Sequence, residues 1–112
     1  FLRHVERTRV LIHLVEPFPT DESDPVSNYH TIRRELANYS LALSQKPEVA
    51  CVSKAELTGA AEVRDRLAAD LGHPVHLISS VTGAGLAGVV GEVTQLLAEV
   101  KRAEREAAER AK

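Results

Sequence analysis

The sequence predicts an α/β fold in which helices cover a parallel sheet, in the order strand, helix, strand, helix, strand, helix. Three short apolar runs, near residues 9–15, 49–52 and 75–78, are typical of buried strands. A longer segment with helical periodicity follows each run. Because strands that alternate with helices pair in parallel through right-handed crossovers, we expect a three-layer α/β domain.

The composition is that of one soluble globular domain. The chain has 112 residues, of which 44% are hydrophobic and 27% charged, and its net charge is −2. This charge argues against a strongly basic nucleic-acid-binding protein, and the single cysteine excludes an internal disulfide. No apolar run approaches the roughly 20 residues of a membrane span, and no signal peptide is found, so we expect a cytoplasmic protein. The chain starts at Phe1 rather than Met, which favours a part of a longer protein.

The N-terminal segment predicts a short helix at residues 1–8 and then the first strand, near residues 9–15. The strand is almost continuously apolar and rich in β-branched residues. It ends before Pro17, because proline cannot continue sheet pairing. His13 alternates with apolar neighbours in this strand, so we expect a histidine in or near the core with its hydrogen bonds satisfied.

The first long helix is predicted to begin at Asp24-Pro25, after an acidic loop. The aspartate is a good N-cap, and proline suits the first helical position. Apolar residues then recur three or four apart as far as Tyr39, and the polar face carries Arg33 and Arg34.

Two further helices are predicted after the second and third strands. One follows Gly59 and ends before Gly72, where glycine suits the position after a helix. Cys51, in the second strand, has the character of a small buried hydrophobe. The last helix is expected to bury one apolar face, made of Leu86, Val89, Val90, Val93, Leu97 and Val100. We expect the domain to cover residues 1–100 and a charged helical tail to follow at residues 101–112.

Two turns at strand ends are candidate binding elements, since ligands bind beyond the carboxyl ends of parallel strands. Lys54 and Glu56 lie two residues apart in the first turn. A lysine stem can lie over a flat ring, and a carboxylate can accept two parallel hydrogen bonds, such as those from two adjacent donors of guanine. The alternative is an ordinary solvated turn. In the second turn, at residues 79–83, backbone N–H groups could donate to a carbonyl, or Thr82 could simply cap the last helix.

The remaining motifs give weaker indications of a binding or catalytic site. Residues 83–88 (GAGLAG) match G-x-G-x-x-G, but a dinucleotide site needs this motif directly after the first strand, so dinucleotide binding is a disfavoured hypothesis. We expect Gly88 and Gly91 to allow close contact between helix and sheet. His73 and His76 have no second ligand pair, so no zinc site is predicted. No catalytic residue and no metal ligand is assigned.

Taken together, these segments resemble the C-terminal half of the GTPase domain of the Obg family, the ribosome-associated bacterial GTPases. The stretches that carry the resemblance are residues 1–8 (FLRHVERT), 24–26 (DPV), 29–36 (YHTIRREL), 39–40 (YS) and 77–83 (LISSVTG). The resemblance implies a Ras-like half-domain of the P-loop NTPase type.

By this resemblance, residues 53–56 (SKAE) occupy the place of the guanine-specifying N-K-x-D motif. Lys54 matches that motif and would lie along the base and ribose. Glu56 stands where aspartate is usual and would pair with the guanine N–H and amino group, and Ser53 replaces asparagine. The resemblance also places the S-A-x turn at Ser79, Ser80 and Val81, whose second residue offers its backbone N–H to the guanine carbonyl oxygen.

The resemblance further implies that the whole protein binds GTP and GDP with Mg²⁺, hydrolyses GTP and acts in assembly of the large ribosomal subunit. These 112 residues contain no G-x-x-x-x-G-K-[ST] loop, which holds the phosphates and supplies a Mg²⁺ ligand. We therefore expect no bound nucleotide or metal in this chain alone, and no GTP hydrolysis by it.

Two further expectations concern partners. In Ras-like domains the strand near residues 9–15 pairs with the phosphate-loop strand, so here we expect an unpaired apolar edge that pairs with another chain or is covered by a rearranged segment. The second function hypothesis is a non-enzymatic α/β module that presents the Arg33–Arg34 helix or the charged tail to RNA or protein.

Overall fold

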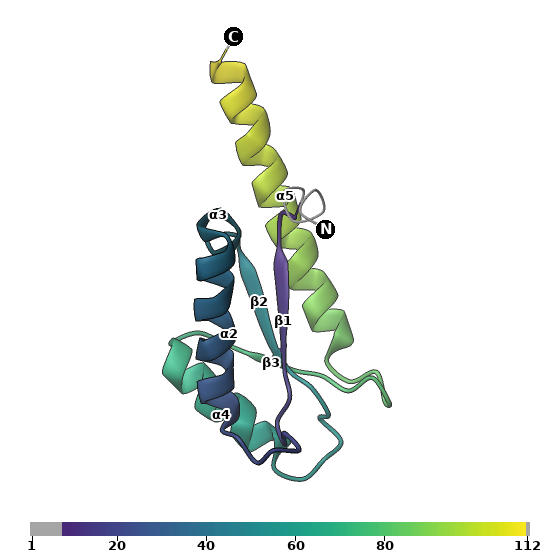
Figure 1. Cartoon of the computed structure of the whole chain (residues 1–112). Coiled ribbons are helices and arrows are strands. Elements are labelled where there is room, and N and C mark those ends of the chain that lie inside the picture. The colour runs from purple at the N-terminus through teal and green to yellow at the C-terminus, as the bar shows by residue number, and fades with distance from the viewer. Residues whose placement is uncertain (1–7, 112) are drawn as a thin grey trace.

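A three-stranded parallel sheet forms the centre of the computed structural model, which describes residues 8–111 (Figure 1). The strands β1 (Leu11–Val15), β2 (Glu48–Val52) and β3 (His76–Leu77) lie in this order across the sheet. Both pairs are parallel. The predicted α/β class and the parallel pairing are confirmed. Of the helix expected at residues 1–8, residues 1–7 lie outside the described part of the chain, and Thr8 is not helical.

The helices cover the two faces of the sheet. The helices α2 (Pro25–Tyr39) and α4 (Ala60–Leu71) lie together on one face, and α5 (Leu86–Arg110) lies on the other (Figure 1). The result is a three-layer arrangement. A one-turn helix, α3 (Leu41–Ser44), follows α2 and was not predicted.

Side chains and glycines set the helix ends where the sequence indicated. Asp24 lies directly before Pro25, the first residue of α2, and its carboxylate accepts from the Ser27 N–H at 3.0 Å. Gly72 ends α4 with a φ of 75°, a left-handed conformation that glycine adopts without steric cost. The unexpected α3 has its own cap, because the Ser40 hydroxyl accepts from the Leu43 N–H at 3.1 Å.

The main core lies between the sheet and the pair α2 and α4. It contains buried residues of β1, α2, β2 and α4 and one residue directly before β3: Val15, Tyr29, Ala50, Val52, Val63, Leu67 and Val75. The core under α5 is smaller and has three buried members, Val49, Cys51 and Val89. The prediction that Cys51 is a small buried hydrophobe is confirmed, since its side chain has no exposed area.

The contact between α5 and the sheet is narrower than predicted. Leu86 and Val90 were expected to be buried, but they are 40% and 63% exposed. The cause is that α5 packs over β2, whose Val49 and Cys51 it covers, and no described residue fills the space beside it. Gly88 does lie against the sheet, because an added Cβ would come within 3.5 Å of His76 Nδ1. The same expectation was wrong for Gly91, where a Cβ would meet nothing within 4 Å.

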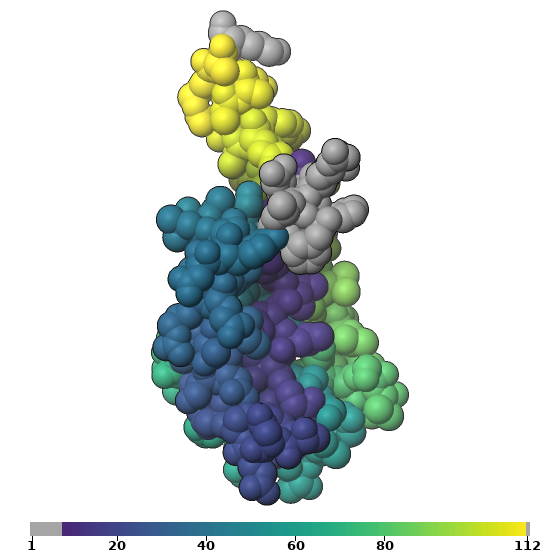
Figure 2. Space-filling view, in the orientation of Figure 1, coloured from purple at the N-terminus to yellow at the C-terminus, as the bar shows by residue number. Residues whose placement is uncertain are grey.

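Strand β1 forms one edge of the sheet and pairs only with β2 among the described residues. Figure 2 shows part of this strand, in purple, at the surface between α2 and α5. Ile12 and Leu14 lie on the α5 side of the sheet and are 53% and 57% exposed. The expectation of an apolar edge is therefore confirmed for residues 8–111.

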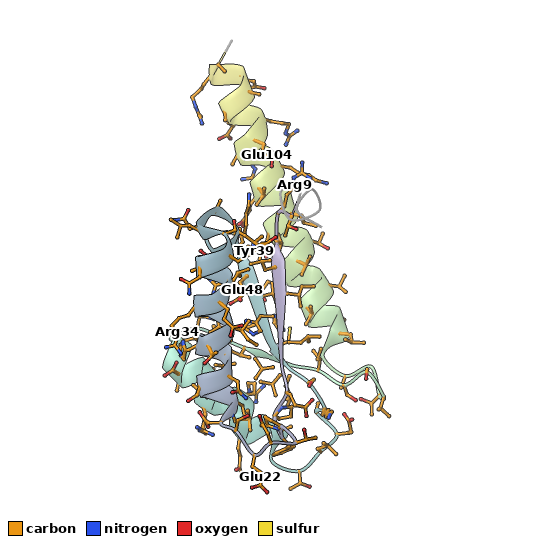
Figure 3. All side chains as sticks on the ribbon, viewed as in Figure 1. Arg9, Glu22, Arg34, Tyr39, Glu48 and Glu104 are labelled. Atoms are coloured by element: carbon orange, nitrogen blue, oxygen red, sulfur yellow. The ribbon has the colours of Figure 1, made fainter. Side chains whose placement is uncertain are left out.

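The C-terminal half of α5 extends beyond the sheet, so the molecule measures 55 × 31 × 28 Å (Figure 1). Near the start of this extension, Arg9 forms a two-point ion pair with Glu104, with distances of 3.1 and 3.3 Å (Figure 3). Within residues 8–111, no helix combines the length and apolar character needed to cross a bilayer.

Candidate functional site

The three strand ends are tied together by main-chain hydrogen bonds at the carboxyl edge of the sheet. Ser53 N–H donates to the Val15 carbonyl at 3.1 Å, which joins the ends of β1 and β2. Ala55 N–H donates to the Ile78 carbonyl at 2.9 Å, which joins the turn after β2 to the end of β3. The two turns predicted to bind a ligand are therefore neighbours, although more than twenty residues separate them along the chain.

Lys54 occupies the most constrained position of the first turn. Its φ is 57°, in the left-handed region that residues other than glycine rarely adopt. Its ammonium Nζ lies 2.8 Å from Glu16 Oε1, which comes from the end of β1. The Lys54 side chain is 48% exposed, so the stem is open to a ligand while its charged end is held.

Glu56 is the second charged group of the first turn, and it is fully exposed. Interaction with the Ser79 hydroxyl is the main cause that lowers the pKa of Glu56 below its ordinary value. Its own backbone N–H lowers the pKa further, and the positive charge of Lys54 adds a smaller contribution. The side chain is thus an ionised acceptor at neutral pH.

Ser79 organises the second turn from a fully buried position. Its hydroxyl oxygen accepts from the Val81 N–H at 3.2 Å and from the Thr82 N–H at 3.1 Å. Its carbonyl accepts from the Gly83 N–H at 2.9 Å, which closes the turn. The Ser80 N–H donates to no group in the described part of the chain and lies on an exposed residue, so it is available as a donor.

Comparison with known proteins identifies the family of this arrangement. No protein-family model matches the chain. The GTPase Obg of Lactobacillus acidophilus is 39% identical over 107 residues, which cover 91% of this chain and 25% of that protein. The GTPase Obg of Magnetococcus marinus is 42% identical over 100 residues, which cover 83% of this chain and 26% of that protein. The chain belongs to the Obg family.

This Obg-family chain spans about a quarter of the length of the curated relatives it matches. A third relative, the GTPase Obg of Bacillus velezensis, is 39% identical over 101 residues, which make up 23% of that protein. The family resemblance stated from the sequence is therefore confirmed over most of the chain.

The glycine-rich segment of this Obg-family chain forms the loop that leads into α5. It follows β3, which is an edge strand in the described sheet, and not the first strand as a dinucleotide site requires. Gly85 is the residue before α5 and has a φ of 77°. A Cβ at Gly85 would lie 2.1 Å from the Leu77 carbonyl oxygen, so this glycine permits a close backbone approach.

A polar cluster under β1 was missed by the sequence analysis. Glu48 accepts from Tyr29 at 2.5 Å through Oε2, while His13 Nδ1 and Arg33 Nη1 lie 3.1 and 3.3 Å from its Oε1. The rings of His13 and Tyr29 stack with centroids 4.5 Å apart. Figure 3 shows Glu48 between α2 and β1. The spacing of Tyr29 and Arg33, four apart on one helix, was the available signal, but their shared partner lies on another element.

A groove of about 610 Å³ runs beside this cluster and is lined by residues of β1, α2 and the acidic loop, with His13 among them. His13 Nε2 is buried and has no hydrogen-bond partner among residues 8–111. Within the described part of the chain, the expectation that all hydrogen bonds of this histidine are satisfied was therefore wrong, because the Nδ1 side alone has a partner there.

The arginines proposed for RNA or protein contact have different surroundings. Arg33 is partly buried, and its Nη2 donates to the Ser44 carbonyl at 2.6 Å in addition to the contact with Glu48. Arg34 lies on the exposed side of α2 and donates to Thr31 at 3.3 Å (Figure 3). The two guanidinium groups therefore do not form one free basic patch.

The cysteine and the paired histidines make no metal centre among the described residues, which hold no group of three or more potential metal ligands. His76 pairs with Glu92 of α5, whereas His73 bonds to the carbonyl of Pro74. Burial, with a smaller effect of the Glu92 charge, raises the pKa of Cys51 to about 11. This thiol is protonated at neutral pH and unsuited to nucleophilic attack.

Proposed function

We propose that residues 53–56 and 79–81 form the guanine-recognition part of an Obg GTPase. The observation that carries this proposal is the direct joining of the two turns at the carboxyl edge of the sheet, through the Ala55–Ile78 hydrogen bond. Ligands of open parallel sheets bind at this edge. The turns offer an exposed carboxylate, a lysine stem and a free backbone N–H, which are complementary to a planar base with adjacent donors and a carbonyl.

Each residue has a role in this proposal. The Lys54 stem lies along the base and ribose, and the Glu56 carboxylate accepts from the guanine ring N–H and amino group. The Ser80 N–H donates to the guanine carbonyl oxygen. Ser79 and Val81 shape the second turn through the bond between the Ser79 hydroxyl and the Val81 N–H. Ser53 anchors the first turn to the end of β1.

We propose that the described residues contact the base and not the phosphates or the Mg²⁺ of a GTP–Mg²⁺ complex. No group of three potential metal ligands occurs in residues 8–111, and the sequence contains no phosphate loop. We therefore propose that the whole protein binds GTP and GDP with Mg²⁺ and hydrolyses GTP, whereas the 112-residue chain does not hydrolyse GTP. The loop and metal ligands that position the phosphates would come from residues outside this chain.

Two wider roles can be proposed, one from the family resemblance and one from the exposed edge of β1. We propose that the whole protein acts in the cytoplasm, with the large ribosomal subunit as its partner during assembly. We also propose that the 112-residue chain self-associates through the edge of β1, whose Ile12 and Leu14 are more than half exposed.

Nucleotide titration tests the main proposal. Fluorescently labelled GDP, ADP and NAD are titrated against the 112-residue chain and against the full-length protein that contains it. We expect the full-length protein to prefer GDP to ADP and NAD, and the 112-residue chain to bind all three weakly, since its sequence contains no loop of the G-x-x-x-x-G-K-[ST] type to hold the phosphates. Absence of nucleotide binding by the full-length protein would contradict the proposal and favour a non-enzymatic interaction module.

A further inference from the structure

Glu16 has no part in the turns described above, yet its carboxylate is directed at one of them. Its Oε1 lies 2.8 Å from the ammonium nitrogen of Lys54. That oxygen is buried and has no hydrogen-bond partner among the described residues, so its contact with Lys54 is an ion pair without hydrogen-bond geometry. The ion pair therefore connects the end of β1 to the lysine of the first turn.

The backbone holds the start of the Lys54 side chain but not its end. Hydrogen bonds of Ser53 and Ala55 fix the turn on both sides of Lys54, whose φ is 57°. The lysine stem has four rotatable bonds, and these remain free unless the ammonium has a partner. Glu16 supplies this partner, so the stem is extended from β2 toward the end of β1.

We propose that Glu16 is a positioning residue of the guanine site, which holds the Lys54 ammonium so that the lysine stem lies where the purine ring binds. This inference rests on the proposed function. Glu16 acts through Lys54 and needs no contact with the nucleotide.

A double-mutant cycle in the full-length protein tests this inference. The dissociation constant for GDP is measured for the wild type, Glu16→Gln, Lys54→Ala and the double variant. Because an ion pair at this exposure contributes modestly, we expect Glu16→Gln to weaken binding about three- to fivefold. In the Lys54→Ala background, Glu16→Gln should have no further effect, because coupled residues are not additive. Glu16→Asp, which keeps the charge on a shorter side chain, should restore part of the affinity.

Glu22→Gln is the matched control, since it removes an exposed acid from the same loop and should leave GDP binding unchanged. If Glu16→Gln weakens binding equally with and without Lys54, Glu16 has a general structural role and the inference is overturned. If the wild type binds GDP and Glu16→Gln binds it equally well, this inference is overturned and the proposed function is not. A wild type that binds no GDP overturns the proposed function, and this inference with it.

Discussion

Glu48 is a carboxylate that folding removes largely from water, with 13% of its side chain exposed. Burial by itself raises the pKa of Glu48, but hydrogen bonds from His13 and Tyr29 and the charge of Arg33 together lower it below the ordinary value. A carboxyl group whose pKa is lowered by folding stabilises the native state above its unfolded pKa, and this stabilisation is lost as the pH falls through the folded pKa. The cluster therefore contributes fully at neutral pH and less in acid.

We expect Glu48→Gln to reduce the free energy of unfolding by about 1–3 kcal/mol at pH 7, because it leaves Arg33 and Tyr29 without their charged partner. The difference from the wild type should shrink as the pH falls below 4.5, the ordinary pKa of the group, since the wild-type carboxyl is then increasingly protonated. Urea unfolding at a series of pH values measures both quantities. A difference that stays constant down to strongly acidic pH would contradict this account of the cluster.

At the scale of elements, the start of α5 depends on one glycine. Gly85 has a left-handed backbone, and its Cα faces the Leu77 carbonyl oxygen so closely that no side chain fits. Gly91 lies within α5, and a Cβ there would meet nothing within 4 Å. The glycine before α5 and the glycine within it should therefore respond in opposite ways to substitution by alanine.

We expect Gly85→Ala to lower the free energy of unfolding by more than about 1 kcal/mol, because the left-handed backbone and the close carbonyl both oppose a Cβ. Gly91→Ala should raise it by about 0.5–1 kcal/mol, since alanine loses less conformational entropy in a helix. Chemical unfolding of both variants measures the contrast. Equal effects of the two substitutions would show that the turn before α5 does not need glycine.

Local sequence patterns predicted the helices and strands better than they predicted which apolar side chains would be buried. The caps Asp24 and Gly72 mark helix ends in the sequence because capping depends on neighbouring residues. Periodicity identified the apolar face of α5, but it could not show that Leu86 and Val90 stay exposed, since this depends on which elements lie beside the helix.

The candidate site, too, could be predicted from the sequence only in part. Both turns could be located from the sequence, because each follows an apolar strand directly. The Glu16–Lys54 ion pair could not, since it forms only when β1 and β2 pair and bring their ends together. The Glu48 cluster was missed for the same reason, because its members come from β1, α2 and β2.

At the scale of the whole molecule, the sheet has one unprotected apolar edge in the described residues. Strand β1 has a partner on one side, and its two exposed apolar side chains lie beside α5 without being covered by it. Exposed apolar strand edges pair with other chains unless charge or proline prevents it. The arrangement therefore favours association between copies of this chain.

We expect the mass of the 112-residue chain in solution to rise with concentration, and Leu14→Lys to keep it monomeric by placing a charge on the strand edge. Val90→Lys is the control, because Val90 is an exposed apolar residue of α5 and is 63% exposed. Sedimentation equilibrium measures the mass of each protein. A wild-type chain that stays monomeric at high concentration would refute association through β1.

The central claim is that Glu56 reads the guanine base, and the direct test compares GDP with IDP, which lacks the 2-amino group. In the full-length protein, we expect the wild type to bind GDP about tenfold or more tightly than IDP, because a hydrogen bond to a charged acceptor contributes about 1.5–3 kcal/mol. Glu56→Ala should bind both nucleotides equally, whereas Glu22→Ala should keep the preference. A preference for GDP that survives Glu56→Ala, or its absence from the wild type, would contradict the account.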